Sequence, residues 1–223
     1  MLHMSTRANY RDAIDHLPGG ATLVLQEVPW EAYEQLLEDL SDRPGIHVTY
    51  DQGKMEIMSP LRKHEKYKEF IGDMVKALAD ELHIDIESSG STTWKSAKEA
   101  KGTEPDICFH VANAGRVIGK DDLDLSIDPP PDLVIEIDVT SESLGKFPIY
   151  AVFEVPEIWR YSDNRKSVLM YELRINEYVE IEASRSFPLL TPEIMAQFVV
   201  QSRTDGQKKA LAAFRQWLRQ QLQ

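Results

Sequence analysis

The chain has 223 residues, 42% of them hydrophobic and 28% charged, which suits one domain with a sizeable core. No apolar run approaches the roughly eighteen residues needed to span a bilayer, so we expect no membrane segment. The formal net charge of −12 weighs against tight nonspecific binding of nucleic acid, which relies on Lys and Arg side chains. The first residues lack the apolar core of a secretion signal and Cys108 is the only cysteine, so we expect a cytoplasmic protein without disulfides.

The first part of the chain combines helical and hairpin patterns. Apolar residues recur at helical spacing in two segments, and the turn signal Asp51-Gln52-Gly53 separates two short strand-like runs. The predicted elements, in chain order, are an irregular or weakly helical lead-in to about residue 20, a helix over 30–40, a hairpin of 46–50 and 54–58, and a long helix over 62–82.

The rest of the chain alternates strands with short helices and ends in two helices. Apolar and β-branched runs predict the strands, while Gly, Pro and Asn clusters predict the breaks. In chain order we expect strand material at 84–86 and 92–94, an exposed loop over 95–103, a strand over 106–111, a turn at 113–115, an acidic loop over 120–131, a strand over 132–139, a helix over 144–153, strands over 157–161, 167–171 and 178–183, and helices on either side of a break at 205–206.

Two carboxylates interrupt the apolar strand predicted over 132–139. Its β-branched composition is typical of a strand buried on both faces of a sheet. Glu136 and Asp138 are two residues apart, so their side chains project from the same face of the strand. An unpaired charge buried on that face would cost several kcal/mol. A buried carboxylate pair therefore needs a cation. Asp106, at the head of another apolar strand, is a third candidate for the same cluster.

Carboxylate oxygens are the ligands that Mg²⁺ and Mn²⁺ prefer, and Mg²⁺ needs few of them because it keeps waters and substrate phosphates. A bound metal of this kind activates water and neutralises charge on a phosphoryl oxygen. Lys146 begins the helix after the strand and can supply an ammonium to such a site. Alternatively, the acids are structural and a buried arginine such as Arg160 neutralises them.

Several motifs together resemble the Uma family of restriction endonucleases, within the PD-(D/E)XK nuclease superfamily. The resemblance covers roughly residues 25–190. The segments that carry it are Pro131-Asp132-Leu133-Val134-Ile135-Glu136-Ile137, then Lys146 and Tyr150, then Val155-Pro156-Glu157-Ile158-Trp159, with Met58-Ser59-Pro60 followed by His64 as an N-terminal signature and Glu104-Pro105-Asp106 as a first acidic motif.

The resemblance implies an α/β, restriction-endonuclease-like core. Its order is helix, three strands, helix, strand (αβββαβ), with a mixed four-stranded sheet flanked by helices, and the N-terminal helix and hairpin and the C-terminal helices are additions. The pattern of predicted elements has the same order. We expect a lead-in over 1–24, the nuclease-like domain over 25–190, and C-terminal helices over 191–223 that pack on the domain or on a partner subunit.

The resemblance also implies a site. Asp106 and Glu136 would hold Mg²⁺ or Mn²⁺. The superfamily motif would place its lysine at position 138, where this chain has Asp138, and Lys146 is the family-like substitute. Asp138 is a further candidate member. His64 or Glu65, in the first turn of the long helix, would add a contact to the site.

The implied activity is a magnesium-dependent endodeoxyribonuclease that binds DNA. Double-strand chemistry and the apolar C-terminal helix suggest a homodimer. The acidic charge and the displaced lysine favour an alternative, a nuclease-like binding or assembly module without cleavage; a hydrolase for another phosphoester is a further one. Basic residues cluster at Arg62, Lys63, Lys66 and Lys68 and again at Lys95, Lys98 and Lys101, either as DNA contacts or as solvated helix and loop faces.

Overall fold

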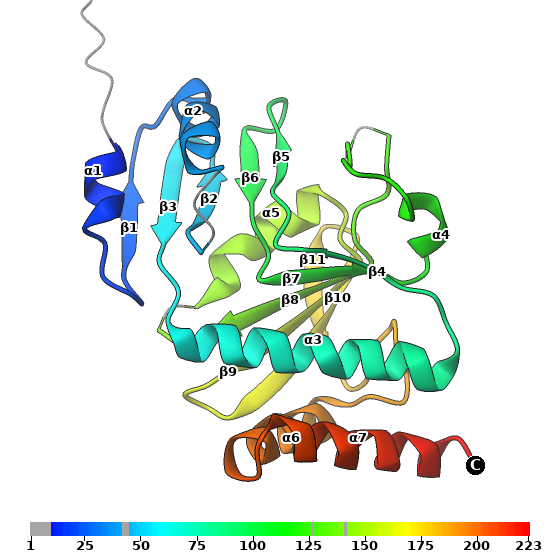
Figure 1. The fold of residues 1–223 in the computed structure, drawn as a ribbon. Helices are drawn as coiled ribbons and strands as arrows, with labels where there is room; N and C mark the ends of the chain where they lie inside the picture. Colours follow the sequence, from blue (N-terminus) through cyan, green and yellow to red (C-terminus); the bar gives the residue numbers. More distant parts are fainter. Residues whose placement is uncertain (1–9, 42–44, 126, 141) are drawn as a thin grey trace, which may run out of the picture.

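The computed structural model describes residues 10–41, 45–125, 127–140 and 142–223. Two sheets stand side by side, with a long helix, α3 (Arg62–Leu82), running along the larger one (Figure 1). The larger sheet has the order β11-β10-β9-β8-β7-β4. Its strands are β4 (Glu87–Gly90), β7 (Ile107–His110), β8 (Leu133–Asp138), β9 (Glu157–Ser162), β10 (Ser167–Arg174) and β11 (Glu177–Ile181).

The larger sheet contains the predicted nuclease-like core. Strands β8 and β9 are parallel, and the other neighbouring pairs are antiparallel, so the sheet is mixed. The crossover from β8 to β9 passes through a 3₁₀ turn, η1 (Ser143–Lys146), and a short helix, α5 (Phe147–Val152). The order α3, β4, β7, β8, α5, β9 is the helix, three strands, helix and strand of the prediction, which is confirmed; β10 and β11 extend this sheet.

Strand β8 is buried along its whole length because helices cover both faces of the sheet. Alternate residues Leu133, Ile135 and Ile137 pack into the cluster formed with α3, whereas Val134 packs into the cluster formed with α5. Burial of such a side chain contributes roughly 1.5–3 kcal/mol. Glu136 belongs to the α5 face and is buried with these apolar neighbours, so the core itself fixes its position.

The smaller sheet has the order β1-β3-β2-β6-β5. Its strands are β1 (Thr22–Leu25), β2 (His47–Asp51), β3 (Lys54–Met58), β5 (Trp94–Ser96) and β6 (Lys101–Thr103), and the helices with it are α1 (Tyr10–Asp15) and α2 (Trp30–Leu40). The predicted helix over 30–40 and the hairpin are confirmed. Tyr33 and Tyr50 stack with their ring centroids 4.8 Å apart and anchor the core of this layer.

The exposed loop predicted over 95–103 is wrong, because this segment contains the β5-β6 hairpin. Its polar residues concealed the strands. Gly102 is required there: a Cβ atom at this position would lie 2.1 Å from the Tyr33 hydroxyl. The glycine that indicated a loop therefore marks a close approach between a strand and an aromatic ring.

Three smaller expectations also differ from the structure. No strand forms at 84–86; the strand lies instead at 87–90, as β4, and pairs with β7 through an irregular register. The turn at 113–115 leads into a one-turn helix, α4 (Ala114–Val117). The lead-in carries α1 and β1, and β1 pairs with β3 across the predicted boundary at residues 24 and 25. The division into a lead-in, a domain and C-terminal helices stays a prediction.

The C-terminal helices α6 (Pro192–Thr204) and α7 (Gln207–Gln221) lie against α3 (Figure 1). Phe198, Phe214 and Leu218 are buried in the cluster that α3 shares with the larger sheet. The apolar face of α7 is thus covered by its own chain. None of the helices in the described part of the chain meets the length and hydropathy needed to cross a membrane.

Candidate active site

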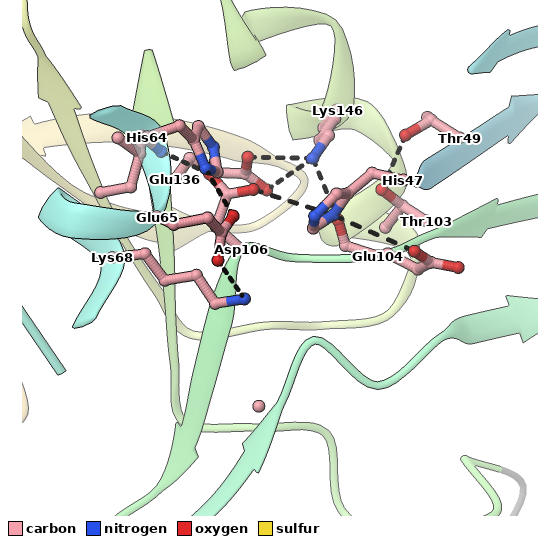
Figure 2. A network of polar contacts seen from close by, with 12 residues as sticks. His47, Thr49, His64, Glu65, Lys68, Thr103, Glu104, Asp106, Glu136 and Lys146 are labelled. Atoms are coloured by element: carbon pink, nitrogen blue, oxygen red, sulfur yellow. Dashed lines mark hydrogen bonds and ion pairs between the residues drawn. The ribbon is translucent and has the colours of Figure 1, made fainter. Parts of the chain in front are cut away.

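The residues predicted for the site come together near the start of β7, inside β8 and at the end of η1. Asp106 directly precedes β7, Glu136 lies in β8, and Lys146 ends η1. Figure 2 shows these three side chains in one polar network with His64 and His47. Asp106 and Glu136 are only 1% and 2% exposed, so their charges depend on the groups around them.

Glu136 is held by two side chains from the crossover after its own strand. The ammonium Nζ of Lys146 lies 2.9 Å and 3.1 Å from the two carboxylate oxygens of Glu136 and donates also to the Glu104 carbonyl oxygen at 3.0 Å. The Tyr150 hydroxyl donates to Glu136 Oε1. Lys146 and Tyr150 are four residues apart, about one helical turn, so both reach one carboxylate. Pro148 in the first turn of α5 starts this helix where it does.

Burial dominates the charge state of this pair. It raises the pKa of Glu136 to about 7, although the nearby Lys146 ammonium favours the carboxylate. Burial alone would lower the pKa of Lys146, but the Glu136 and Asp106 carboxylates raise that pKa above its ordinary value. Lys146 is therefore a permanently charged group at neutral pH, and Glu136 is a carboxylate whose proton affinity is high.

Asp106 binds its partners through a single oxygen. Its Oδ2 accepts hydrogen bonds from His64 Nε2 at 3.0 Å and from the backbone N–H of Ile137 at 2.6 Å. Burial would raise the pKa of Asp106, but the His64 bond and the charge of Lys146 lower it to about 2. Asp106 is therefore an anion throughout the physiological range of pH.

His64 lies in the first turn of α3, and the structure places it in direct contact with Asp106. Its other ring nitrogen, Nδ1, lies 3.2 Å from Glu65 Oε1. Burial would lower the pKa of His64, but the bonds to Asp106 and Glu65 raise it to about 9, so the ring is a cation that donates from both nitrogens. Glu65 is on the far side of His64, is partly exposed and forms an ion pair with Lys68 at 3.5 Å.

Sequence reasoning missed His47, which comes from the smaller sheet. His47 Nδ1 lies 3.9 Å from Asp106 Oδ1, and within the described chain neither of these buried atoms has a hydrogen-bond partner. Burial lowers the pKa of His47 to about 4, so its ring is neutral. No motif or spacing indicates this residue. The only available signal was indirect: β2 pairs with β6, and the chain runs directly from β6 to Glu104 and Asp106.

Glu104 forms the outer wall of the network. Its Oε1 accepts a hydrogen bond from the Thr93 hydroxyl at 3.0 Å, and its Oε2 lies 4.0 Å from His47 Nδ1. Burial raises the pKa of Glu104 to about 7. The acidic motif that contains Asp106 therefore supplies a second, partly buried acid to the same region.

Asp138 has a different environment. Its carboxylate accepts from Arg160 Nε and, at 3.0 Å, from the backbone N–H of Ser143. Arg160 also reaches Glu142 at 3.4 Å. Arg160, the arginine considered as a structural partner, thus neutralises Asp138. Asp106 instead contacts His64, and Glu136 contacts Lys146.

A small cavity of about 60 Å³ joins these groups. It is lined by His47, Asp106, Glu136, Asp138 and Lys146, among others, and Glu65 does not reach it. Of the six residues predicted for the site, four therefore share one cavity, His64 contacts it through Asp106, and Glu65 is placed behind His64.

The donor set of this cavity fits a hard divalent cation. Asp106 Oδ1 is buried, without a partner in the described chain, and it shares the cavity with the Glu136 carboxylate. Among the residues with described positions, no three or more His, Cys, Asp or Glu side chains are grouped as a ready-made metal cage. Mg²⁺ usually binds only one or two carboxylates and keeps its waters, so two acids suffice.

A comparison with protein families assigns the chain to one of them. The sequence model of the Uma2 family, described as "Putative restriction endonuclease", matches residues 30–202. No curated protein matches the chain. Among solved structures, a crystal structure described as "a putative nuclease belonging to DUF820" from Anabaena variabilis is similar, with a TM-score of 0.48 and 16% identity over 68% of this chain and 90% of that chain.

Proposed function

Since the chain belongs to the Uma2 family of restriction endonucleases, we propose that it hydrolyses the phosphodiester bonds of DNA as a metal-dependent endonuclease. One observation carries the proposal. The cationic Lys146 contacts Glu136 in the same cavity where the anionic Asp106 has one buried oxygen without a hydrogen-bond partner among the described residues. A fixed ammonium beside two carboxylates is the arrangement that phosphodiester hydrolysis needs.

Asp106 and Glu136 would hold Mg²⁺ or Mn²⁺. When bound, the metal supplies positive charge that neutralises a phosphoryl oxygen and lowers the pKa of a water. The chain's own residues prepare these two ligands: His64 and the Ile137 N–H fix Asp106 in its orientation, and Tyr150 fixes Glu136. Both acids are thus preorganised before any ligand arrives.

Lys146 would act on the reacting groups. Its charge lies close to both acids, so it can orient the attacking water or stabilise the negative charge that develops as the water oxygen bonds to phosphorus and the bond to one ester oxygen breaks. His47, whose Nδ1 lies 3.9 Å from Asp106 Oδ1, would border the bound metal on the side of the smaller sheet. Asp138 would position Arg160 and the start of η1 and would not bind the metal.

A second candidate function is a nuclease-like binding or assembly module that does not cleave. The observation in its favour is that Lys146 and Tyr150 engage both oxygens of Glu136, within a chain of net charge −12. The proposed homodimer rests on double-strand chemistry alone, because the apolar face of α7 packs on its own chain.

Calorimetric titration with Mn²⁺ tests the metal site directly. The wild type should bind the ion, Asp106→Asn should bind it at least tenfold more weakly, and Asp73→Asn, a matched change at an exposed carboxylate on α3, should bind it like the wild type. Equal binding by all three proteins would remove Asp106 from the metal site. No binding by the wild type would favour the module without cleavage.

A further inference from the structure

A second cavity, of about 610 Å³, lies between the first turn of α3 and the turn that joins α6 to α7. It is far larger than the cavity that holds the acids. Four of its eight lining residues are cations and none is an acid, in a protein whose net charge is −12. The lining residues that matter here are Arg62, Lys63, Lys66, Tyr67, Arg203 and Gln207. We call this the basic pocket.

One buried carboxylate sits behind the basic pocket and cannot neutralise it. Asp163 receives ion pairs from Lys63 and Lys166, an ion pair from Arg203 at 3.4 Å, and a hydrogen bond from the Tyr67 hydroxyl. A single negative charge compensates only one of these three cations. The Asp163 group therefore keeps an excess of positive charge and at the same time holds Lys63 and Arg203 in place.

Two further cations of the pocket, Arg62 and Lys66, lack an acidic partner among the residues with described positions. In the part of the chain that the structure describes, no carboxylate forms an ion pair with Arg62 or Lys66, and both residues are exposed. Elsewhere on the surface, exposed cations such as Lys54 and Lys76 do pair with a nearby acid. Arg62 and Lys66 are thus available to an external anion.

The basic pocket is adjacent to the candidate active site. His64, which contacts Asp106, stands between Lys63 and Lys66 in the same helical turn, so the site and the pocket lie on different faces of the start of α3. A hydrogen bond from Gln207 Nε2 to the Lys66 carbonyl oxygen, at 3.1 Å, ties the start of α7 to this turn. Figure 1 shows the start of α3 and the α6-α7 turn at the same end of the molecule.

We propose that the basic pocket binds the phosphates of a DNA strand next to the one placed at Asp106 and Glu136. This inference rests on the proposed function. The site and the pocket both involve the first turn of α3, where His64 contacts Asp106 and Lys63 and Lys66 line the pocket, and successive phosphates of one strand follow at about 3.4 Å along the duplex axis, so the proposal places phosphates neighbouring the scissile one at the pocket. The arginines can bind such phosphates through two hydrogen bonds each. The pocket thus supplies the positive charge that the overall composition lacks.

The test is fluorescence anisotropy of a labelled DNA duplex titrated with the full chain, in EDTA to prevent cleavage, over a range of salt concentrations. Arg62→Ala/Lys66→Ala removes two cations without breaking an ion pair. Lys54→Ala/Lys76→Ala is the control, with the same change of net charge at exposed positions outside the pocket. The pocket variant should flatten the slope of log K against log salt by about 1.8 and weaken binding roughly ten- to hundredfold near 0.1 M salt, because each lost phosphate contact changes the slope by about 0.9.

A third variant separates charge from shape. Arg62→Lys/Lys66→Arg keeps both cations and should retain the wild-type slope, and thermal melts followed by circular dichroism should show all variants folded. The inference is overturned if the pocket variant binds like the control, if the charge-conserving variant loses as much affinity as the alanine variant, or if the wild type shows no salt-dependent binding of the duplex.

Failure of the basic pocket and failure of the proposed nuclease activity give different experimental results. Glu136→Gln should end cleavage and leave duplex affinity and its salt slope unchanged. Duplex binding that depends on the pocket, in a protein that never cleaves, would retain the pocket and reject the nuclease. Cleavage by a protein whose duplex affinity does not depend on Arg62 and Lys66 would retain the nuclease and reject the pocket.

Discussion

Lys146 Nζ lies within 3.1 Å of both carboxylate oxygens of Glu136, although the two residues are ten positions apart and belong to different elements. The lysine reaches the strand acid from the end of η1. Position 138, two residues after Glu136 in β8, carries instead an aspartate paired with Arg160. A cation thus lies next to the strand carboxylate even though the local motif is interrupted, and this pair is the basis of the first prediction.

Lys146→Met should reduce cleavage by about 10²- to 10³-fold, the range for losing one group that stabilises developing charge. Metal affinity should change little, because an ammonium does not ligate a cation. Plasmid cleavage rates and Mn²⁺ calorimetry measure the two effects separately. Lys76→Met is the matched control, an exposed lysine on α3 outside the network that pairs with Asp73, and its cleavage rate should stay near that of the wild type. Loss of Mn²⁺ binding in Lys146→Met would contradict the role assigned to the ammonium.

Asp138→Asn should destabilise the fold by about 3–5 kcal/mol, because it leaves Arg160 buried without its carboxylate. Glu142 is the other acid near Arg160, and its side chain is 61% exposed. Glu142→Gln should therefore lower the free energy of unfolding by less than about 1 kcal/mol. Urea unfolding followed by circular dichroism compares the two. Equal losses in the two variants would mean that Arg160 does not depend on Asp138.

Stability at acidic pH should depend on Asp163. Burial would raise the pKa of this carboxyl, but the bonds from Lys166, Lys63 and Tyr67 hold it well below its ordinary value of 3.8. A lowered folded-state pKa contributes stability that is fully present above about 3.8 and is lost as the pH falls through the folded-state value.

Asp163→Asn should therefore lower the free energy of unfolding at neutral pH and flatten its decline between about pH 4 and pH 2 relative to the wild type. Urea unfolding at a series of pH values measures both changes. Parallel curves for the two proteins over this range would show that Asp163 titrates alike in the folded and unfolded chain.

Gly102→Ala should destabilise the smaller sheet by roughly 1–3 kcal/mol, because the added methyl group would lie 2.1 Å from the Tyr33 hydroxyl. Gly115→Ala is the control: apart from its chain neighbours and its own helix backbone, no atom of the described chain lies within 4 Å of its Cβ position, and in helix α4 alanine is preferred to glycine. Thermal melts should show a lower midpoint for the first variant only. A Gly102→Ala midpoint equal to that of the wild type would indicate that β6 moves away from Tyr33 without cost.

Much of the larger sheet could be predicted from the sequence because its elements carry strong local patterns. Helix α3 has apolar residues at helical spacing along its 21 residues, and β8 is a mostly apolar run rich in β-branched residues. The four-residue spacing of Lys146 and Tyr150 also holds in the structure, where both side chains meet Glu136.

The smaller sheet and His47 could not be predicted in this way. Strands β5 and β6 are three residues each and mostly polar, and Gly102 indicates a loop unless its contact with Tyr33 is known. His47 reaches Asp106 only because β2 pairs with β6, which is a long-range pairing without a local signature. The part of the site that sequence reasoning missed is thus the part that a second sheet contributes.

Cleavage of supercoiled plasmid in Mg²⁺ or Mn²⁺ is the most direct test of the central claim that Asp106 and Glu136 form a nuclease site. The wild type and Asp73→Ala should nick the plasmid, and Asp106→Ala and the wild type in EDTA should not. Undiminished nicking by Asp106→Ala, or no nicking by the wild type with either metal together with no metal binding by calorimetry, would contradict the account.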